Sequence, residues 1–285
     1  MTLPINNNSS SNTFSPCNIA FIGGGNMASA IIGGLLKRGV TAGNIQVVEP
    51  LEEQRLRLRQ QFNVQARETS GPGLAGSDMV VWAVKPQSFK DAALRARFHT
   101  RNALHLSVAA GIRSDSIAHW LATERVVRAM PNTPALIGQG MTALFARPAV
   151  TLADRALAGN VIQTTGEHLW LSDESQLDAV TALSGSGPAY VFYFIEAMVE
   201  SGMAMGLSQQ QAHKLAVGTF VGASALAHTS SEPPDVLRAQ ITSKGGTTHA
   251  ALMSMEQDRV KTLFMRAMHI AKQRARELGD EFGSV

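Results

Sequence analysis

The chain of 285 residues contains a single cysteine, Cys17, so no intramolecular disulfide can form. A lone thiol fits a reducing compartment, and we expect a cytoplasmic protein. Because no base lies near Cys17 in the sequence, we interpret it as a buried residue at the start of the first strand. The eight histidines are scattered, and the sequence offers no recognisable metal-binding cluster.

Aromatic residues are scarce at 6%, and the formal net charge is only +3. The aromatic residues do not interleave with basic ones, so we expect no nucleic-acid partner. The basic run at 55–59 is interpreted as a solvated helix face.

Long apolar runs are also missing. No uninterrupted apolar stretch reaches the roughly 20 residues that cross a bilayer, so no membrane partner is expected. Residues 1–16 are rich in Asn, Ser and Thr and contain no charged residue. They lack the features of a signal or transit peptide, and we interpret them as a disordered tail.

Short apolar, β-branched runs alternate with helical patterns in the first half of the chain. The helical patterns are 26–37 and a charged stretch from Leu51, and the strand-like runs are 19–22, 45–48, 79–84, 104–108 and 126–129. Such alternation predicts a parallel sheet with helices on both faces. We therefore expect an α/β, doubly wound Rossmann-type domain over residues 17–173.

The character changes after Ser172, where strand patterns give way to helical stretches at 189–205, 209–228 and 255–278. Residues 174–285 are therefore expected to form an all-helical substrate and dimerisation domain. These helices are apolar over much of their circumference, so their surfaces must be buried in an intramolecular core or a homodimer. We favour the homodimer.

A glycine-rich loop follows the first strand and opens a helix. Gly23, Gly24, Gly25, Asn26 and Met27 form it, and Gly23, Gly25 and Ala28 match the G-x-G-x-x-A dinucleotide fingerprint. The first glycine permits a tight turn and the second lets a pyrophosphate approach the backbone. A merely tight turn is the alternative, but the strand–turn–helix context favours NADPH or NADH.

The end of the second strand bears on which dinucleotide binds. Glu49 offers a carboxylate that suits the ribose hydroxyls of NADH and repels the 2′-phosphate of NADPH. Arg55 offers a charge to that phosphate, so both cofactors stay open, with a lean toward NADH.

Other strand ends supply further candidates for the cofactor crevice, because ligands bind at the carboxyl ends of parallel strands. They are Ala83, Val84, Lys85, Pro86, Ala109 and Asn132. Lys85 is either a solvent-facing strand end or a neighbour of the cofactor. Asn132 either contacts cofactor, bridges by a hydrogen bond, or forms an Asx turn. The 184–189 segment brings backbone near the reacting ring or acts as a hinge.

A second loop, 242–248, combines glycines with hydroxyls before a helical run. Backbone N–H groups at a helix N-terminus form a receptor for a small carboxylate. We expect Gly246, Thr247 and Thr248 to donate N–H groups, with Ser243 and Gly245 completing the substrate-binding loop. Helix capping by Thr247 and Thr248 is the alternative.

Taken together, the chain resembles the pyrroline-5-carboxylate reductase family. The resemblance rests on six segments in order: FIGGGNMASAIIGGL, AVKPQ, SVAAGI, RAMPNTPALIGQGMTAL, ALSGSGPAYVFYFIEAM and ITSKGGTTHAAL. Many members have proline where this chain has Lys244, which we interpret as a solvated side chain.

The resemblance implies that hydride from NAD(P)H reduces the cyclic imine 1-pyrroline-5-carboxylate to L-proline. It also implies a homodimer, often assembled further into a ring of dimers, and it places Thr248 near the ring nitrogen as an orienting or proton-relaying group. His249 is nearest the signature, but a helix-surface or interface role is favoured. The alternatives are a reductase of a six-membered cyclic imine and a regulatory dinucleotide-binding module without catalysis.

Overall fold

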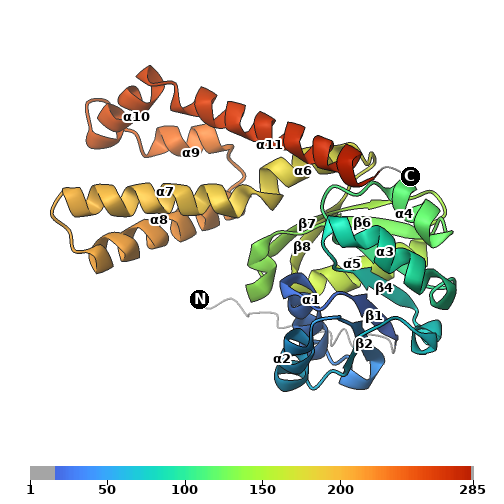
Figure 1. The fold of residues 1–285 in the computed structure, drawn as a ribbon. Coiled ribbons are helices and arrows are strands. Elements are labelled where there is room, and N and C mark those ends of the chain that lie inside the picture. Colours follow the sequence, from blue (N-terminus) through green and yellow to red (C-terminus); the bar gives the residue numbers. More distant parts are fainter. Residues whose placement is uncertain (1–16, 284–285) are drawn as a thin grey trace, which may run out of the picture. The chain divides into compact units, whose positions relative to one another are not determined.

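The computed structural model describes residues 17–283 and divides the chain into two compact units (Figure 1). The first unit comprises the chain up to Gly185 together with the segment that begins at Arg274. The second unit comprises Ser186–Gln273. The tail expected at 1–16 lies outside the described residues. Within residues 17–283, no helix combines the length and apolar character needed to cross a lipid bilayer.

The first unit is built on an eight-stranded sheet with the order β3-β2-β1-β4-β5-β6-β7-β8. Only the β6–β7 pair is antiparallel. The chain reverses its direction of sheet growth between β1 and β4, the switch point at which doubly wound sheets bind dinucleotides. The strands are β1 (Ile19–Ile22), β2 (Ile45–Val48), β3 (Ala66–Arg67), β4 (Met79–Trp82), β5 (Leu104–Ser107), β6 (Val126–Met130), β7 (Gly140–Ala146) and β8 (Gly166–Trp170).

Helices cover both faces of this sheet. They are α1 (Asn26–Lys37), α2 (Glu52–Phe62), α3 (Pro86–Ala96), α4 (Ser114–Leu121), α5 (Leu152–Ile162) and α6 (Gln176–Val180). Short helical turns connect them: η1 (Ala42–Asn44), η2 (Pro72–Gly76), η3 (Arg97–His99), η4 (Thr133–Ile137), η5 (Gln163–Thr165) and the π-helical turn η6 (Thr181–Gly185).

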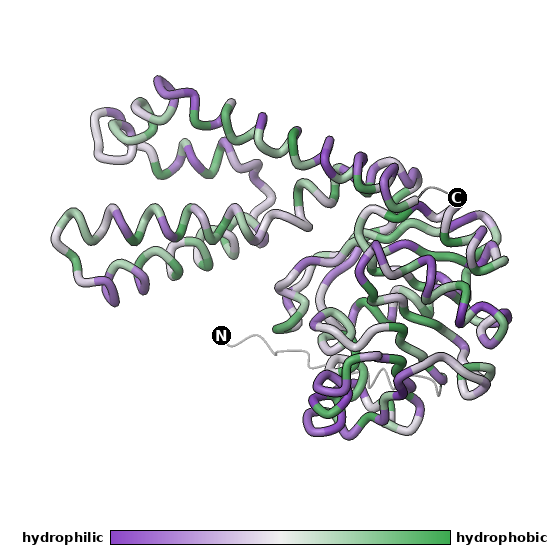
Figure 2. Tube along the Cα trace, in the orientation of Figure 1, coloured by the Kyte–Doolittle hydropathy of each residue, from purple (hydrophilic) through white to green (hydrophobic). Residues whose placement is uncertain are grey.

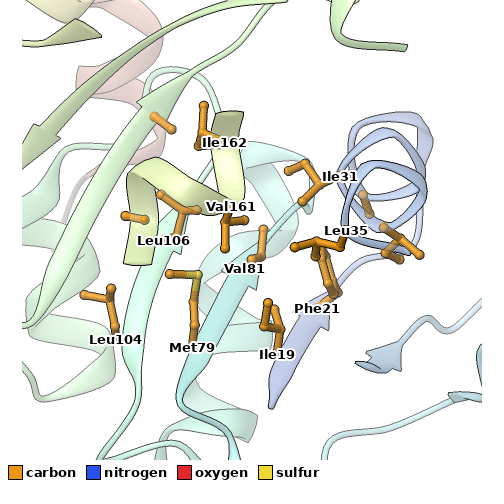
Figure 3. Packing of buried hydrophobic residues seen from close by; sticks show 14 of the residues in the cluster. Ile19, Phe21, Ile31, Leu35, Met79, Val81, Leu104, Leu106, Val161 and Ile162 are labelled. Atoms are coloured by element: carbon orange, nitrogen blue, oxygen red, sulfur yellow. The ribbon is translucent and has the colours of Figure 1, made fainter. Parts of the chain in front are cut away.

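Alternate residues of the strands feed two hydrophobic clusters, one on each face. Ile19 and Phe21 of β1 pack with α1 and α5, where Ile31 and Val161 are buried (Figure 3). Ala20 and Ile22 belong to the opposite cluster, which contains residues of α3 and α4. The period of two along β1 thus divides its side chains between the faces, as a sheet buried on both sides requires.

The sheet is larger than the sequence analysis predicted. The expected strands are all present, but β3, β7 and β8 were not foreseen, and β7 runs antiparallel to β6. Cys17 is only half-buried before β1, which corrects the expectation of a fully buried thiol. Burial and the nearby Asp78 carboxylate raise the pKa of that thiol.

The second unit contains helices and no strand among its described residues. The helices are α7 (Gly187–Ala204), α8 (Gln209–Thr229), α9 (Pro234–Gln240), α10 (Thr247–Gln257) and the start of α11 (Val260–Phe282). The expected single helix over 255–278 is wrong, because the chain breaks between α10 and α11. Arg259 adopts a left-handed conformation there, with φ 54°. α9 was also not foreseen.

Helices α7 and α8 pack closely, because Gly202 of α7 faces Ala212 of α8, both buried. Hydrophobic residues nevertheless recur along the length of these helices (Figure 2). Phe192, Tyr193 and Leu226 are exposed. The units also divide the chain differently from the expected boundary between 173 and 174, because α6, η6 and the end of α11 all belong to the first unit.

Candidate active site

The glycine loop after β1 has the geometry of a phosphate cradle. Gly23 has φ +96°, and a Cβ there would lie 2.5 Å from the Ala83 carbonyl oxygen, so only glycine fits. Gly25 is exposed, and a Cβ there would meet no atom within 4 Å. α1 begins at Asn26 with no side-chain cap. The first N–H groups of a helix lack intrahelical partners, so this end is suited to an anion.

Glu49, directly after β2, is buried and tied to this loop. One carboxylate oxygen accepts a hydrogen bond from the Gly24 N–H at 2.8 Å, and the other accepts from the Leu51 N–H at 2.9 Å. The guanidinium of Arg55 donates to the carbonyl oxygens of Glu49 and Pro50 at 2.9 and 2.6 Å. Arg55 therefore lies against the segment that follows β2, whereas Arg57 and Arg59 of the basic run are exposed as expected.

A cavity of about 300 Å³ opens beside Gly23. Pro50 lines it, and so do three polar residues of α3: Ser88, Asp91 and Arg95. Sequence reasoning missed these three residues. Their spacing of three and four along a helix that starts at the carboxyl end of β4 places them on one face, and this was the available signal.

The segment after β4 continues the crevice. The Ala83 N–H donates to the Ile22 carbonyl at 2.8 Å, which holds the ends of β4 and β1 together. Ala83 and Val84 are half-buried, and Pro86 is the first residue of α3. Lys85 is exposed directly before it.

Trp82, the last residue of β4, forms a buried hydrogen bond with His105 of β5. The Trp82 indole N–H donates to Nδ1 of His105 at 3.0 Å, and the other ring nitrogen of His105 lies 3.1 Å from the Thr100 carbonyl oxygen. This pattern assigns the proton of the neutral ring to Nε2. Desolvation by burial lowers the pKa of His105 from 6.5 to about 4. His105 is therefore a neutral structural residue at physiological pH.

The next strand ends supply small and bridging residues. Ala109 follows β5 and is buried, with its N–H donating to the Ser107 hydroxyl at 3.3 Å. Asn132 follows β6. Its side-chain amide donates to the Ser184 carbonyl at 3.1 Å, and its side-chain oxygen accepts from the Met141 N–H at 2.9 Å. Of the three roles expected for Asn132, these contacts correspond to the bridging hydrogen bond. They do not form an Asx turn.

The bridge made by Asn132 brings the 130–134 and 184–185 segments of the first unit together. A Cβ at Gly185 would lie 2.5 Å from the terminal methyl group of Met130, so glycine permits this approach. The first unit thus collects all its expected cofactor segments at the carboxyl ends of β1, β2, β4, β5 and β6. No group of three or more potential metal ligands among His, Cys, Asp and Glu was found in the described part of the chain.

The hydroxyl-rich loop lies in the second unit. Gly245 has φ +77°, and Gly246 precedes α10 without any side-chain cap. The Gly246 N–H donates to the Ser243 carbonyl at 3.0 Å, which corrects its expected role as a free donor. Thr247 and Thr248 open the helix, so their N–H groups have no intrahelical acceptor. Ser243, Lys244 and Thr247 are exposed, and Thr248 is half-buried.

Comparison with known proteins gives two matching families. Residues 174–278 match a family described as pyrroline-5-carboxylate reductase dimerisation. Residues 18–111 match a family described as NADP oxidoreductase, coenzyme F420-dependent. The match over residues 18–111 falls on the sheet and glycine loop, and the match over 174–278 includes all of the second unit.

Whole-chain relatives agree with these matches. A pyrroline-5-carboxylate reductase of Pseudomonas aeruginosa is 42% identical over 93% of this chain and 98% of its own length. One of Pisum sativum is 35% identical over 91% and 95%. The solved structure of such a reductase from Coxiella burnetii superimposes with a TM-score of 0.86 at 34% identity, covering 94% of this chain and 99% of that one. A Plasmodium falciparum pyrroline carboxylate reductase, solved with NADP bound, gives a TM-score of 0.83 at 26% identity, with 92% and 98% coverage.

Proposed function

The chain belongs to the pyrroline-5-carboxylate reductase family, and we propose how its own residues divide the work of the reaction. It is an NAD(P)H-dependent oxidoreductase that reduces the C=N bond of 1-pyrroline-5-carboxylate to give L-proline. The first unit holds the dinucleotide, and the α10 N-terminus in the second unit holds the substrate carboxylate. The observation that carries this assignment is the open glycine cradle at Gly25 before an uncapped helix.

The pyrophosphate is assigned to Gly25, Asn26 and Met27, because the Gly24 N–H already donates to the Glu49 carboxylate. Because Gly25 is free of neighbours on its Cβ side, a phosphate can approach the backbone there. The positive end of the α1 dipole favours the negative charge. When bound, the cofactor supplies the hydride that reduces the imine carbon.

We assign the discrimination between NADH and NADPH to Glu49. Its carboxylate is buried beside the glycine loop and held by two backbone N–H groups. A 2′-phosphate placed beside this negative charge would be repelled, whereas ribose hydroxyls can donate hydrogen bonds to it. The proposal is a preference for NADH, with the adenosine end in the cavity between Pro50 and the Ser88 face of α3.

The nicotinamide end is assigned to Ala83, Val84, Lys85, Pro86, Ala109 and Asn132. Pro86 fixes the turn into α3, and Ala109 is small, which leaves room for a flat ring at the carboxyl end of β5. Asn132 holds the neighbouring 184–185 backbone rather than projecting freely, so its part here is to shape the wall of the site.

The substrate carboxylate is assigned to the N–H groups of Thr247 and Thr248, strengthened by the α10 dipole. The Ser243 and Thr247 hydroxyls are exposed and can donate to it as well. Gly245 provides the left-handed turn that lets the chain enter the helix.

Thr248 is assigned the orientation of the ring nitrogen, or the relay of a proton to it. An imine carbon is more electrophilic when its nitrogen is protonated. A hydroxyl beside that nitrogen can therefore assist hydride transfer by relaying a proton to it. Positioning is the main demand of this reaction, because the acceptor carbon is already electrophilic.

The test is Thr248→Val assayed with pyrroline-5-carboxylate, with NADH and NADPH in parallel. We expect kcat/KM for the imine to fall by about 100-fold or more, the range of general acid–base groups. Thr248→Ser keeps a hydroxyl and serves as the matched control, with activity near that of the parent protein. Unchanged kcat/KM in Thr248→Val would remove the proton-relay role, and a preference for NADPH would overturn the role of Glu49.

The assembly proposed is a homodimer through the helical unit, with a further ring of dimers. The match to a dimerisation family and the exposed apolar side chains of α7 and α8 support the homodimer. A cytoplasmic location is proposed from the lone cysteine.

A further inference from the structure

The chain from the end of β5 into the first turn of α4, residues 108–116 and here called the connection, is held by two parts of the chain that are distant in sequence. One anchor is Glu174, which follows β8. The other is the last part of α11 together with Gly283, residues 274–283. Both anchors and the connection belong to the first unit. Residues 274–283 are also where the chain returns to this unit.

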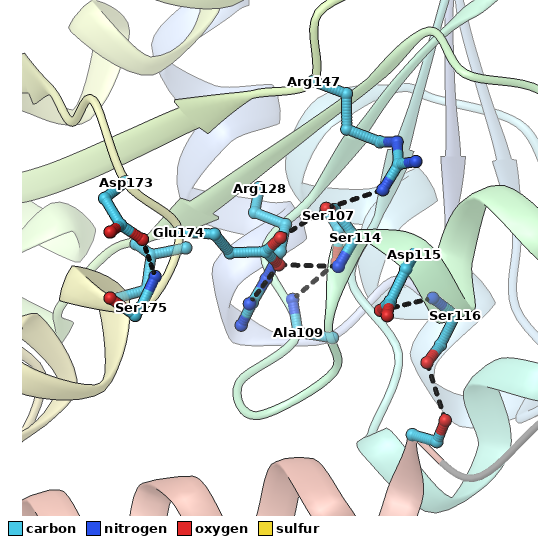
Figure 4. Close-up of polar contacts among 12 residues, drawn as sticks. Ser107, Ala109, Ser114, Asp115, Ser116, Arg128, Arg147, Asp173, Glu174 and Ser175 are labelled. Atoms are coloured by element: carbon cyan, nitrogen blue, oxygen red, sulfur yellow. Dashed lines mark hydrogen bonds and ion pairs between the residues drawn. The ribbon is translucent and has the colours of Figure 1, made fainter.

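The first anchor is a charged network around Glu174 (Figure 4). One carboxylate oxygen accepts from the Arg128 guanidinium and from the Ser114 N–H, each at 2.6 Å. The other accepts from the Ser114 hydroxyl at 2.5 Å. Arg147 donates to the same hydroxyl at 3.1 Å. A carboxylate from a distant loop therefore satisfies the first N–H of α4, where a local capping side chain is absent.

The second anchor is the end of α11. Gly279 packs on Gly111 so closely that a Cβ on Gly279 would lie 2.8 Å from the Gly111 carbonyl oxygen. Gly111 itself has φ +81°, a conformation that favours glycine. Arg113 forms an ion pair with Asp280, and the Ser116 hydroxyl donates to the Gly283 carbonyl at 2.6 Å. The contacts cover the connection from Gly111 to Ser116.

Ala109 lies at the start of this connection, two residues before the glycine contact. We propose that the connection is a positioning element for the nicotinamide end of the cofactor, and that Gly279 and Ser114 are positioning residues that act through it. This rests on the proposed function, which puts the nicotinamide beside Ala109. Neither residue touches the reacting atoms. Each holds backbone that leads directly to Ala109.

The test uses the full-length variants Gly279→Ala and Ser114→Ala. In Gly279→Ala the new methyl group forces the Gly111 backbone to shift. In Ser114→Ala the Glu174–Arg128 pair is kept and only the hydroxyl contacts are lost. Gly159→Ala is the matched control, because Gly159 is also a buried helix glycine, but its Cβ would face the His168 ring at 3.1 Å.

The measurements are kcat and KM for pyrroline-5-carboxylate at saturating dinucleotide, and the Kd of ADP-ribose, which lacks the nicotinamide. We expect kcat to fall at least tenfold in Gly279→Ala and severalfold in Ser114→Ala. The Kd of ADP-ribose should stay within twofold, and Gly159→Ala should keep the parent kcat. A merely structural role would weaken ADP-ribose binding and kcat together, and that result overturns the inference.

Ala109→Val separates this inference from the proposed function. If Ala109→Val loses activity while Gly279→Ala and Ser114→Ala keep it within twofold, only the positioning inference is overturned. If Ala109→Val itself keeps the parent kcat and KM, the placement of the nicotinamide is wrong, and the positioning inference fails with it.

Discussion

In the first unit Phe21, Ile31 and Leu35 are each 0% exposed, whereas in the second unit Phe192, Tyr193 and Leu226 are 65, 69 and 68% exposed. The first set fills a core between sheet and helices that one chain completes alone. The second set leaves a large apolar surface uncovered, which is typical of an obligate subunit interface. Large hydrophobic side chains therefore stabilise the folded core of the first unit, and in the second unit they are available for association.

The largest effect is expected in the buried core. Phe21→Ala should lower the free energy of unfolding by about 3–5 kcal/mol, because it removes packing and leaves a cavity. Urea unfolding followed by tryptophan fluorescence measures this selectively, since Trp82, Trp120 and Trp170 all lie in the first unit. A loss below about 1 kcal/mol would contradict the description of a tightly packed core.

Protonation of His105 at acidic pH is expected to lower the free energy of unfolding by about 3 kcal/mol. Its folded pKa of about 4 is below its ordinary 6.5, because burial opposes the charged ring. The unfolded chain therefore binds more protons between these values, so stability is lost as pH falls from about 6.5 to 4 and this contribution levels off below.

Urea unfolding of the parent protein and of His105→Asn at several pH values checks this contribution. The asparagine variant should be less stable at pH 7, since the ring contacts to Trp82 and Thr100 change, but it should lose less stability over that pH range. An identical pH dependence in both proteins would show that His105 is not the titrating group.

Association is expected to respond to a charge on the helical unit. Leu226→Glu on α8 should weaken the dimer by about 2 kcal/mol or more, because a buried interface cannot hydrate the carboxylate. Sedimentation over a dilution series measures the dimer Kd. Leu152→Glu is the control, because Leu152 is 86% exposed at the start of α5 in the first unit, where an acidic residue suits the helix dipole. Equal dimer affinity for both variants would refute the assignment of α8 to the interface.

The smallest effect, the loss of stability on removing a helix-capping side chain, should be similar in the two units. Both contain a capping box, Thr151 with Asp154 before α5 and Ser208 with Gln211 before α8. Thr151→Ala and Ser208→Ala should each cost about 1 kcal/mol, because each frees a backbone N–H at a helix start. Thermal unfolding of both variants tests this, and a cost confined to one of them would show that its helix start is held by other contacts.

The sequence predicted the central elements well because their patterns are local. β1, β2 and α1 have the expected bounds, and Gly23 adopts the positive φ that the fingerprint requires. β3 is only two residues long, and β7 and β8 owe their pairing to sheet neighbours rather than to their own composition. The break at Arg259 was missed because neither glycine nor proline marks it.

The backbone conformation of the candidate site was predictable where a motif defines it. Gly23 and Gly245 illustrate this, since each adopts a positive φ that favours glycine. The capture of Asn132 by Ser184 and Met141, and of Ser114 by Glu174, depends on chain segments that meet only in the folded protein. Such long-range partners leave no periodic signal along the chain.

The return of residues 274–283 to the first unit has a consequence for biosynthesis of the protein. The Rossmann sheet is complete in sequence by Trp170, yet the segment that seats Gly279 against Gly111 is synthesised after the whole second unit. Domains fold as units during translation, with N-terminal parts first. The cofactor-binding unit therefore emerges with one surface uncovered, and it closes only after the whole helical insertion has left the ribosome.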